Sequence, residues 1–129
     1  MSSTTEIKVR FSETDLLGHV NNASYFVYLE EARIDFLREV LPEKKKTFVV
    51  VSVKCDFIRQ AYFGQRLIIH TSIVKIGNTS FTLIQEIKDK ESGQLIAKGQ
   101  SVVVHYNFEK QKSEPLTPNM RERLLEQMD

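Results

Sequence analysis

The sequence predicts an α+β fold in which one long helix packs against a curved antiparallel β-sheet. Three features predict it. A helical pattern of about five turns occurs once, near the N-terminus. The segments after it read as long strands joined by tight turns, and a short amphipathic helix follows the last of them. Helix and strands are segregated along the chain, which favours an antiparallel sheet.

Composition limits the class of protein. The 129 residues are 41% hydrophobic and 27% charged, as expected for one globular domain spanning the whole chain, 1–129, and not for a disordered one. The net charge of +1 argues against an electrostatic nucleic-acid binder. No apolar stretch approaches the roughly 20 residues of a membrane span. The N-terminus lacks the pattern of a signal peptide, so we expect a cytoplasmic protein that neither binds nor crosses a membrane.

The first element is a strand from Thr5 to Ser12. Ile7, Val9 and Phe11 alternate with polar residues, and a period of two is typical of a half-buried strand. The next ten residues, 13–22, contain Asp, Gly and paired Asn, which indicates a loop.

The long helix is predicted from Ala23 to Leu41. This stretch has no Gly or Pro, and Pro42 ends it. Asn21 or Asn22 supplies the N-cap. Helical spacing places on one face a wide apolar stripe, which we expect to pack deep against the sheet: Tyr25, Tyr28, Leu29, Ala32, Phe36 and Val40, widened by Phe26, Leu37 and Leu41.

After a charged linker from Pro42 to Lys46, four β-rich segments follow. They span Thr47–Ala61, Arg66–Lys75, Thr79–Lys88 and Leu95–Phe108. Thr117 then caps a short C-terminal helix that begins at Pro118 and runs through Gln127. One long helix cannot cover both faces and both edges of such a sheet, so we expect part of it to meet another subunit.

Asp15 is the first candidate for chemistry, because it lies in the loop that leads to the long helix. A helix N-terminus presents free N–H groups and partial positive charge, which can polarise a carbonyl and stabilise an oxyanion. A nearby carboxylate can act as general base or nucleophile. The alternative is that Asp15 only caps the turn at Leu17 and Gly18.

Other candidates have structural alternatives. His19 could bind a carbonyl, orient Asp15 or move a proton, or it could be a loop histidine bonded to backbone. Arg33 lies near the apolar side of the helix, where an ion pair with Glu30 is favoured over a substrate phosphate. Cys55, His70 and His105 lie in strand patterns and read as core or interface side chains rather than metal ligands. Nucleophile-elbow, Walker and dinucleotide-binding motifs are absent from the sequence.

The stretch from Arg10 to Arg33, RFSETDLLGHVNNASYFVYLEEAR, resembles the signature of hotdog-fold acyl-CoA thioesterases, in particular the 4-hydroxybenzoyl-CoA thioesterase family. Three parts agree together: T-D-x-x-G-H-x-N-N, then Y-F at the helix start, then E-E-A-R. The strands that follow the helix agree too, so the resemblance extends through Phe108.

The resemblance implies a helix wrapped by the sheet, edge-to-edge homodimers often paired into homotetramers, and thioester hydrolysis with no metal or cofactor. It places Asp15 at the catalytic carboxylate position and the backbone N–H near Asn22 where the thioester carbonyl is polarised. His19 and Asn21 fall in the loop that faces the ligand.

The acyl pocket is expected beside the helix start, at a subunit interface. Tyr25, Phe26 and Phe57 are its expected liners, with ordinary core packing as the alternative. In part of the family the turn between the middle strands binds the phosphates of coenzyme A. Here that turn, Gly77–Ser80, is neutral, so Arg59, Lys54 or another subunit is expected to do so.

Two other functions fit this fold class. A hotdog-fold enoyl-CoA hydratase or dehydratase needs a His and an acid opposed across the acyl chain, but no His leads a Gly-x-Pro segment here. A non-catalytic acyl-CoA-binding module is the other alternative, and the pair of Asp15 and His19 argues against it.

Overall fold

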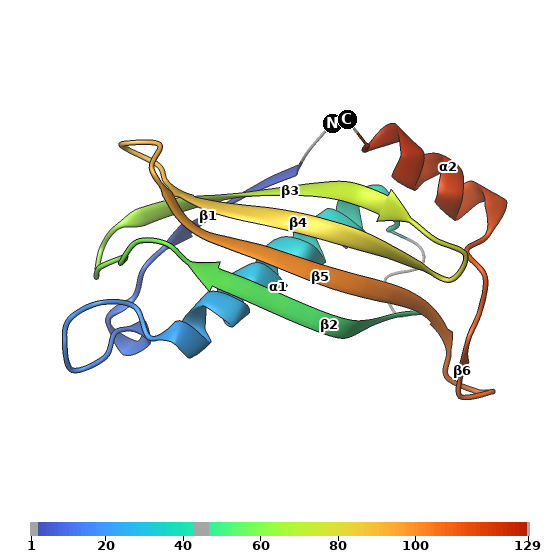
Figure 1. Cartoon of the computed structure of the whole chain (residues 1–129), viewed down its shortest axis with the longest axis horizontal. Coiled ribbons are helices and arrows are strands. Elements are labelled where there is room, and N and C mark those ends of the chain that lie inside the picture. The colour runs from blue at the N-terminus through green and yellow to red at the C-terminus, as the bar shows by residue number, and fades with distance from the viewer. Residues whose placement is uncertain (1–2, 43–46, 129) are drawn as a thin grey trace.

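The computed structural model describes residues 3–42 and 47–128. Its main layer is a sheet with one long helix, α1, lying across one face (Figure 1). The elements are β1 (Ser3–Lys8), a 3₁₀ turn (Phe11–Glu13), α1 (Asn22–Val40), β2 (Phe48–Phe57), β3 (Arg66–Ile76), β4 (Ser80–Asp89), β5 (Leu95–Asn107), β6 (Lys112–Ser113) and α2 (Pro118–Glu126). This confirms the predicted α+β class and the long helix wrapped by a sheet.

The sheet is antiparallel throughout and has the strand order β1-β3-β4-β5-β2, with the short β6 paired to β5. Buried and partly exposed residues alternate along β3 and β4, because successive side chains point to opposite faces. The register shifts once within β2 and once within β3, and such bulges add bend and twist. The curved sheet can therefore follow the helix.

The predicted apolar face of α1 is confirmed. All six residues of the predicted stripe are buried, and so are Leu37 and Leu41. The prediction that Phe26 belongs to this buried face is wrong, because its side chain is 39% exposed.

The two long sides of α1 have different surroundings. Thr5 Oγ1 donates to Asp35 Oδ2 at 2.8 Å and Ser3 Oγ to Glu39 Oε2 at 3.1 Å, so one side faces β1. The Phe26 ring lies 6.3 Å from the Phe57 ring, so the other side faces β2. The β1 side is closed by polar contacts within the chain, and the β2 side ends at the sheet edge.

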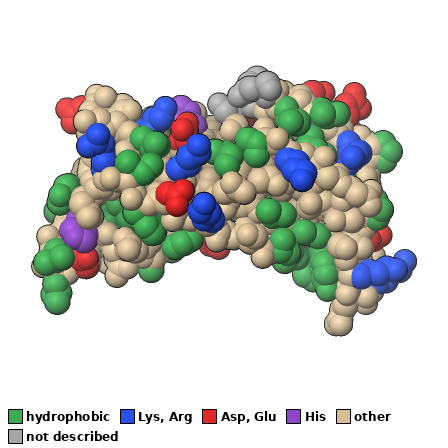
Figure 2. Space-filling view, in the orientation of Figure 1, with side chains coloured by type: hydrophobic (Ala, Val, Ile, Leu, Met, Phe, Trp, Pro, Cys, Tyr) green, Lys and Arg blue, Asp and Glu red, His purple; other side chains and the backbone are tan. Residues whose placement is uncertain are grey.

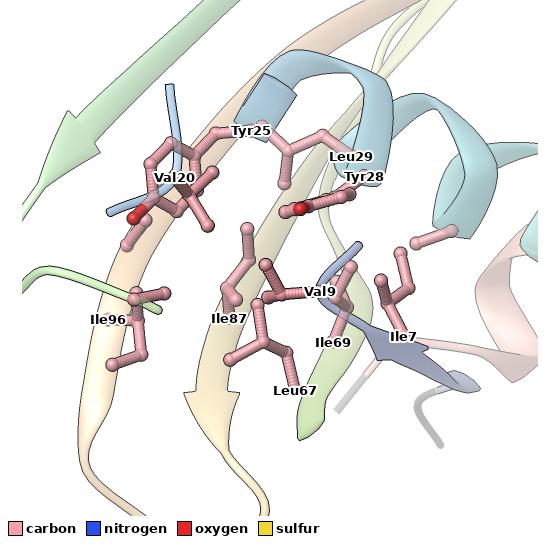
Figure 3. Packing of buried hydrophobic residues seen from close by; sticks show 13 residues of the cluster. Ile7, Val9, Val20, Tyr25, Tyr28, Leu29, Leu67, Ile69, Ile87 and Ile96 are labelled. Atoms are coloured by element: carbon pink, nitrogen blue, oxygen red, sulfur yellow. The ribbon is translucent and has the colours of Figure 1, made fainter. Parts of the chain in front are cut away.

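The buried apolar residues form two clusters, one under each half of α1. Figure 3 shows the first, in which Tyr25, Tyr28 and Leu29 of the helix point toward Leu67, Ile69 and Ile87 of the sheet. The second brings α2 and the end of α1 together around Phe36, Phe81 and Leu124. Buried polar side chains, among them Thr71, Gln85 and Ser101, belong to neither cluster.

Gln85 of β4 forms hydrogen bonds that join the sheet to α1. Its Nε2 donates to the backbone oxygen of Leu29 at 3.0 Å and to Thr71 Oγ1 at 3.2 Å. Its Oε1 accepts a long hydrogen bond, 3.5 Å, from Arg33 Nη1. Burial lowers the pKa of the Arg33 guanidinium, and the charge of Glu30 opposes this.

The prediction of an ion pair between Arg33 and Glu30 is wrong. Among the described residues, no carboxylate oxygen lies within 4.0 Å of the Arg33 guanidinium. Arg33 is only 6% exposed and turns inward to Gln85, whereas Glu30 is exposed. The Arg33 charge is therefore buried without a counter-ion from the described part of its own chain.

The predicted bounds of the first strand, Thr5 to Ser12, are also wrong. It begins at Ser3 and ends at Lys8, and the predicted inward Phe11 is 75% exposed. The chain leaves the strand because the Arg10 backbone N–H and guanidinium both donate to the Glu13 carboxylate, closing a 3₁₀ turn. Residues 43–46 of the expected charged linker lie outside the described residues.

The remaining predicted strands are confirmed within a few residues, except that the segment predicted to end at Ala61 leaves β2 after Phe57. The short β6 was not predicted. Thr117 caps α2 as expected, its Oγ1 accepting from the Met120 amide at 3.2 Å. Within the described part of the chain, neither helix combines the length and hydropathy needed to cross a bilayer.

β2 is one of the two edge strands of the main sheet, β1 being the other, and it is the more exposed of the two. Most of its residues are exposed although the strand is rich in apolar side chains, including Val50, Val51, Val53 and Phe57. On the sheet face turned away from α1, by contrast, charged side chains of both signs are scattered among hydrophobic ones (Figure 2). The edge is thus the part of the sheet where apolar surface is left uncovered.

Gly99 on β5 marks the closest approach of sheet and helix. A Cβ at this position would lie 2.7 Å from Leu29 Cδ1 and 3.0 Å from Cδ2, and Leu29 is itself buried. We expect Gly99→Ala to lower the free energy of unfolding by about 1–3 kcal/mol through overpacking. Chemical denaturation measures this, with Gln100→Ala at the neighbouring exposed position as the control. Equal stability of the two variants would contradict the close contact.

Candidate functional site

The N-terminus of α1 has a backbone amide, that of Asn22, with no acceptor among the described residues. Asn21 is the N-cap, and its Oδ1 accepts from the Ala23 amide at 2.9 Å. The Asn21 N–H donates to the backbone oxygen of Glu13, and the Ser24 N–H donates to the backbone oxygen of Asn21. Among the described residues the Asn22 N–H has no acceptor, so it is the free donor at the positive end of the helix.

This arrangement decides between the two predicted caps. Asn21 has extended backbone angles, φ −63° and ψ 136°, whereas Asn22 is the first residue of the helix. The amide expected to polarise a carbonyl is therefore available at Asn22. Because an N–H at this position has no partner within the helix, a bound oxygen atom can accept from it without breaking an existing bond.

The loop before the helix is a tight hairpin. Asp15 N–H donates to the His19 oxygen and Gly18 N–H to the Asp15 oxygen, at 2.9 and 3.1 Å. Gly18 has φ 87°, a conformation that favours glycine. The loop is held to the segment after β2, since Val20 N–H donates to the Ala61 oxygen and His19 forms an isolated bridge with Tyr62.

The Asp15 carboxylate has two contacts within this hairpin. Oδ1 accepts from the Leu17 amide at 2.8 Å, which is the turn-capping contact. Oδ2 lies 3.3 Å from His19 Nδ1, and the Asp15 side chain is 32% exposed. The turn cap and the Asp15–His19 pair therefore coexist: one oxygen fixes the carboxylate while the other faces an imidazole and remains open to solvent.

Glu13 anchors the start of the loop to α1. Its Oε1 accepts from the Arg10 amide and from the Tyr28 hydroxyl, both at 2.8 Å. Burial acts to raise the pKa of Glu13, but hydrogen bonds from Arg10 and Tyr28 outweigh it and lower the pKa overall. For Tyr28, burial and the bond to Glu13 raise the pKa. A charged carboxylate thus fixes this end of the loop on a buried tyrosine of the helix.

A cleft opens between the first turn of α1 and the end of β2. It is lined by Asn22, Tyr25, Phe57, Ile58, Arg59 and Gln60. The Tyr25 and Phe57 rings are 5.3 Å apart at 59°, and they form an aromatic wall beside the free amide of Asn22. Burial raises the pKa of Tyr25, against a smaller opposing effect of the Ala61 backbone.

The structure brings together four of the predicted site residues in this cleft: Asn22, Tyr25, Phe57 and Arg59. Phe26 packs edge-on to Phe57 beside it. Asp15 and His19 lie in the adjoining hairpin and do not line the cleft of the single chain, and the Asn21 side chain is used as the cap. Ile58 and Gln60 were missed, although their places on either side of Arg59 could have indicated them.

Two other groups have no part in this cleft. Burial raises the pKa of the Cys55 thiol to about 11, which makes it a poor nucleophile. Among the described residues, no three His, Cys, Asp or Glu side chains gather closely enough to hold a metal ion. The chemistry that the described residues themselves offer is a free amide at a helix N-terminus and a nearby carboxylate paired with a histidine.

Comparison with known proteins gives consistent matches. The model of the thioesterase-like superfamily matches residues 9–124. The long-chain acyl-CoA thioesterase FadM of Escherichia coli is 34% identical over 129 residues, which is 96% of this chain and 97% of FadM. The solved structure of a predicted thioesterase from Bacillus stearothermophilus is 36% identical and superposes with a TM-score of 0.92, covering 100% of this chain and 98% of that one.

A third match includes a bound ligand. A thioesterase from Thermus thermophilus, solved in complex with coenzyme A and Zn, is 30% identical with a TM-score of 0.85, and the match covers 94% of this chain and 95% of that one.

The cap gives a test of the helix start. We expect Asn21→Ala to lower the free energy of unfolding by about 1 kcal/mol, because the Ala23 amide loses its acceptor. Asn22→Ala is the matched control, since the Asn22 side chain accepts none of these bonds, and it should change stability by less than about 0.5 kcal/mol. Chemical denaturation of both variants measures the difference. If Asn22→Ala cost as much as Asn21→Ala, the assignment of the cap would be wrong.

Proposed function

The chain belongs to the thioesterase-like superfamily and has its hotdog fold, and from this premise we propose that it hydrolyses acyl-CoA thioesters to coenzyme A and a carboxylic acid. The observation that carries the proposal is the free amide of Asn22, a residue that lines a cleft beside the hairpin that bears Asp15. The similarity to FadM and to the coenzyme A complex supports the substrate class.

In the proposed mechanism the thioester carbonyl oxygen accepts a hydrogen bond from the Asn22 N–H. The positive end of α1 adds to this interaction, and both strengthen as negative charge develops on the oxygen. The donor is fixed in place before the substrate arrives, because Asn21 caps the helix and the following turns are buried. Little reorganisation is needed at the moment of reaction.

Asp15 supplies the second part of the mechanism. As a general base it takes a proton from water while the water oxygen attacks the carbonyl carbon, and the carbon–sulfur bond then breaks to release the thiolate of coenzyme A. As a nucleophile it attacks the same carbon, the carbon–sulfur bond breaks to release the coenzyme A thiolate, and water then hydrolyses the resulting mixed anhydride to the acid and free Asp15. His19, 3.3 Å from Asp15 Oδ2, orients the carboxylate in either route.

The residues that line the cleft suit two parts of the substrate, the acyl group and the phosphates of coenzyme A. Tyr25 and Phe57, with Phe26 beside them, provide apolar surface for the acyl group. Arg59 lines the same cleft and is exposed, so it provides a cation for the phosphates of coenzyme A. Lys54 lies on β2 with its side chain 71% exposed and is the further candidate.

We also propose that two copies pair through β2. This strand is an edge of the sheet, and its exposed apolar residues would be covered by antiparallel pairing with the same strand of a second copy. Since the cleft lies at the end of β2, the site then adjoins the subunit interface. Pairing of two dimers into a homotetramer and a cytoplasmic location remain predictions from the sequence.

Asp15→Asn tests the chemistry directly. The amide keeps an oxygen that can accept from Leu17, so the turn should persist, while kcat/KM for thioester hydrolysis should fall at least about 100-fold. Asp89→Asn is the matched control, because the Asp89 carboxylate caps the turn between β4 and β5 by accepting from Ser92 at 2.8 Å. Release of free thiol from a panel of acyl-CoAs measures turnover.

The results separate the candidate functions. Full activity of Asp15→Asn would remove Asp15 from the mechanism. If the wild-type protein binds acyl-CoA without releasing thiol, it is a binding module. If it adds water to an enoyl-CoA and leaves the thioester intact, it is a hydratase.

A further inference from the structure

The starting point is the buried charge of Arg33. Its side chain is 94% buried, given its 6% exposure, and its hydrogen bond to Gln85 Oε1 is long, 3.5 Å. Gln85 is neutral, and its Nε2 is already committed to Leu29 and Thr71. A buried cation normally has a paired anion. Within residues 3–42 and 47–128, none is within ion-pair distance of Arg33.

Arg33 lies on the side of α1 that faces the sheet edge. Helical spacing places Phe26, Glu30 and Arg33 in one row, at i, i+4 and i+7, and Phe26 contacts Phe57 of β2. The opposite side of the helix is bonded to β1 through Asp35 and Glu39. Glu30 and Arg33 therefore share the side that leads to the open edge.

This side carries uncovered apolar surface. On α1, Phe26, Val27 and Ile34 are exposed, and on β2 the exposed apolar residues are Val50, Val51, Val53 and Phe57. This surface combines charged and apolar side chains of α1 with the edge of β2, which is unpaired among the described residues. A partner that also presents charged and apolar side chains beside an unpaired strand would complement it. A second copy of this chain meets that requirement by itself.

Symmetry then decides which residues face each other. Antiparallel pairing of β2 with its copy places a two-fold axis between the two strands, and it brings the two α1 helices side by side and antiparallel. Gln85 pairs with Gly99, which pairs with Cys55, so the row of residues to which Arg33 bonds reaches β2 at Cys55, in the half of the strand that leads to the cleft. Glu30 and Arg33 also lie on either side of the middle of α1 (Asn22–Val40).

We propose that Arg33 pairs with Glu30 of the partner subunit, and that the same contact recurs across the two-fold axis. Glu30 is exposed in the single chain, and no carboxylate of the described residues lies within ion-pair distance of Arg33, so each would gain a partner of opposite charge in the dimer. The two ion pairs fix the register of the helices and remove the cost of an unpaired buried cation. The inference rests on the proposed β2 dimer and adds the interaction that selects it.

Reversing the charge of Glu30 tests the contact. Glu30→Arg places two cations against each other on both sides of the axis, and the dimer dissociation constant from sedimentation equilibrium should rise at least about tenfold. Glu31→Arg is the matched control, with the same charge change one residue along the helix. Glu31 is exposed and its charge acts on Arg10, on the side away from β2, so this variant should dimerise as the wild type does.

The double variant Glu30→Arg, Arg33→Glu restores opposite charges and should recover a dissociation constant within about tenfold of the wild type. Circular dichroism checks that each variant is folded. If the double variant fails to fold, Glu30→Arg with Arg33→Met replaces it, since loss of the facing cation should also relieve the repulsion. Dimerisation of Glu30→Arg at wild-type strength, or no recovery in the folded second-site variant, would overturn the ion pair.

The same measurements keep the proposals apart. A monomeric wild-type protein at micromolar concentration would overturn the β2 dimer and the ion pair together. A wild-type dimer that releases no thiol from acyl-CoA would overturn the proposed activity and leave the ion pair standing.

Discussion

The start of α1 is the constraint on which the proposed site depends. A helix must begin with N–H groups that lack partners within the helix. Here the first-turn amides of Ala23 and Ser24 donate to Asn21, whereas that of Asn22 has no acceptor in the described part of the chain. The helix cannot shift to hide this amide, because Tyr25, Tyr28 and Leu29 are buried against the sheet in the next two turns (Figure 3). The free donor is therefore held at the cleft by the packing of the core.

The same packing gives α1 two unlike sides. Toward β1, hydrogen bonds from Ser3 and Thr5 close the contact within the chain. Toward β2, the helix carries exposed apolar side chains and the buried Arg33, which has no anion within ion-pair distance among the described residues. The candidate active site and the proposed subunit contact thus lie along the same side of one helix, so that a second copy would help to enclose the cleft.

Local pattern was sufficient to predict the helix and the later strands. The resemblance to the thioesterases led to Asn22, Tyr25, Phe57 and Arg59, which lie together along the cleft. Local pattern failed where a partner distant in the sequence, or a local side-chain contact, decided the outcome. The alternation of Ile7, Val9 and Phe11 continues past the end of β1, but the Arg10–Glu13 pair closes a turn and exposes Phe11. Glu30 lies about one helical turn before Arg33, yet Arg33 turns inward to Gln85, 52 residues away. The apolar sequence of β2 also could not show that the strand lies at an edge.

The central claim is that a thioester carbonyl binds the Asn22 amide. NMR of the ¹⁵N-labelled protein can test it with a ketone analogue of acyl-CoA, in which a methylene replaces the sulfur so that the carbonyl remains and cannot be hydrolysed. At saturation the Asn22 amide proton should shift downfield as it gains an acceptor, while the amide of Ala23, already bonded to Asn21, should change much less. An analogue that binds while the Asn22 resonance stays in place would contradict the account.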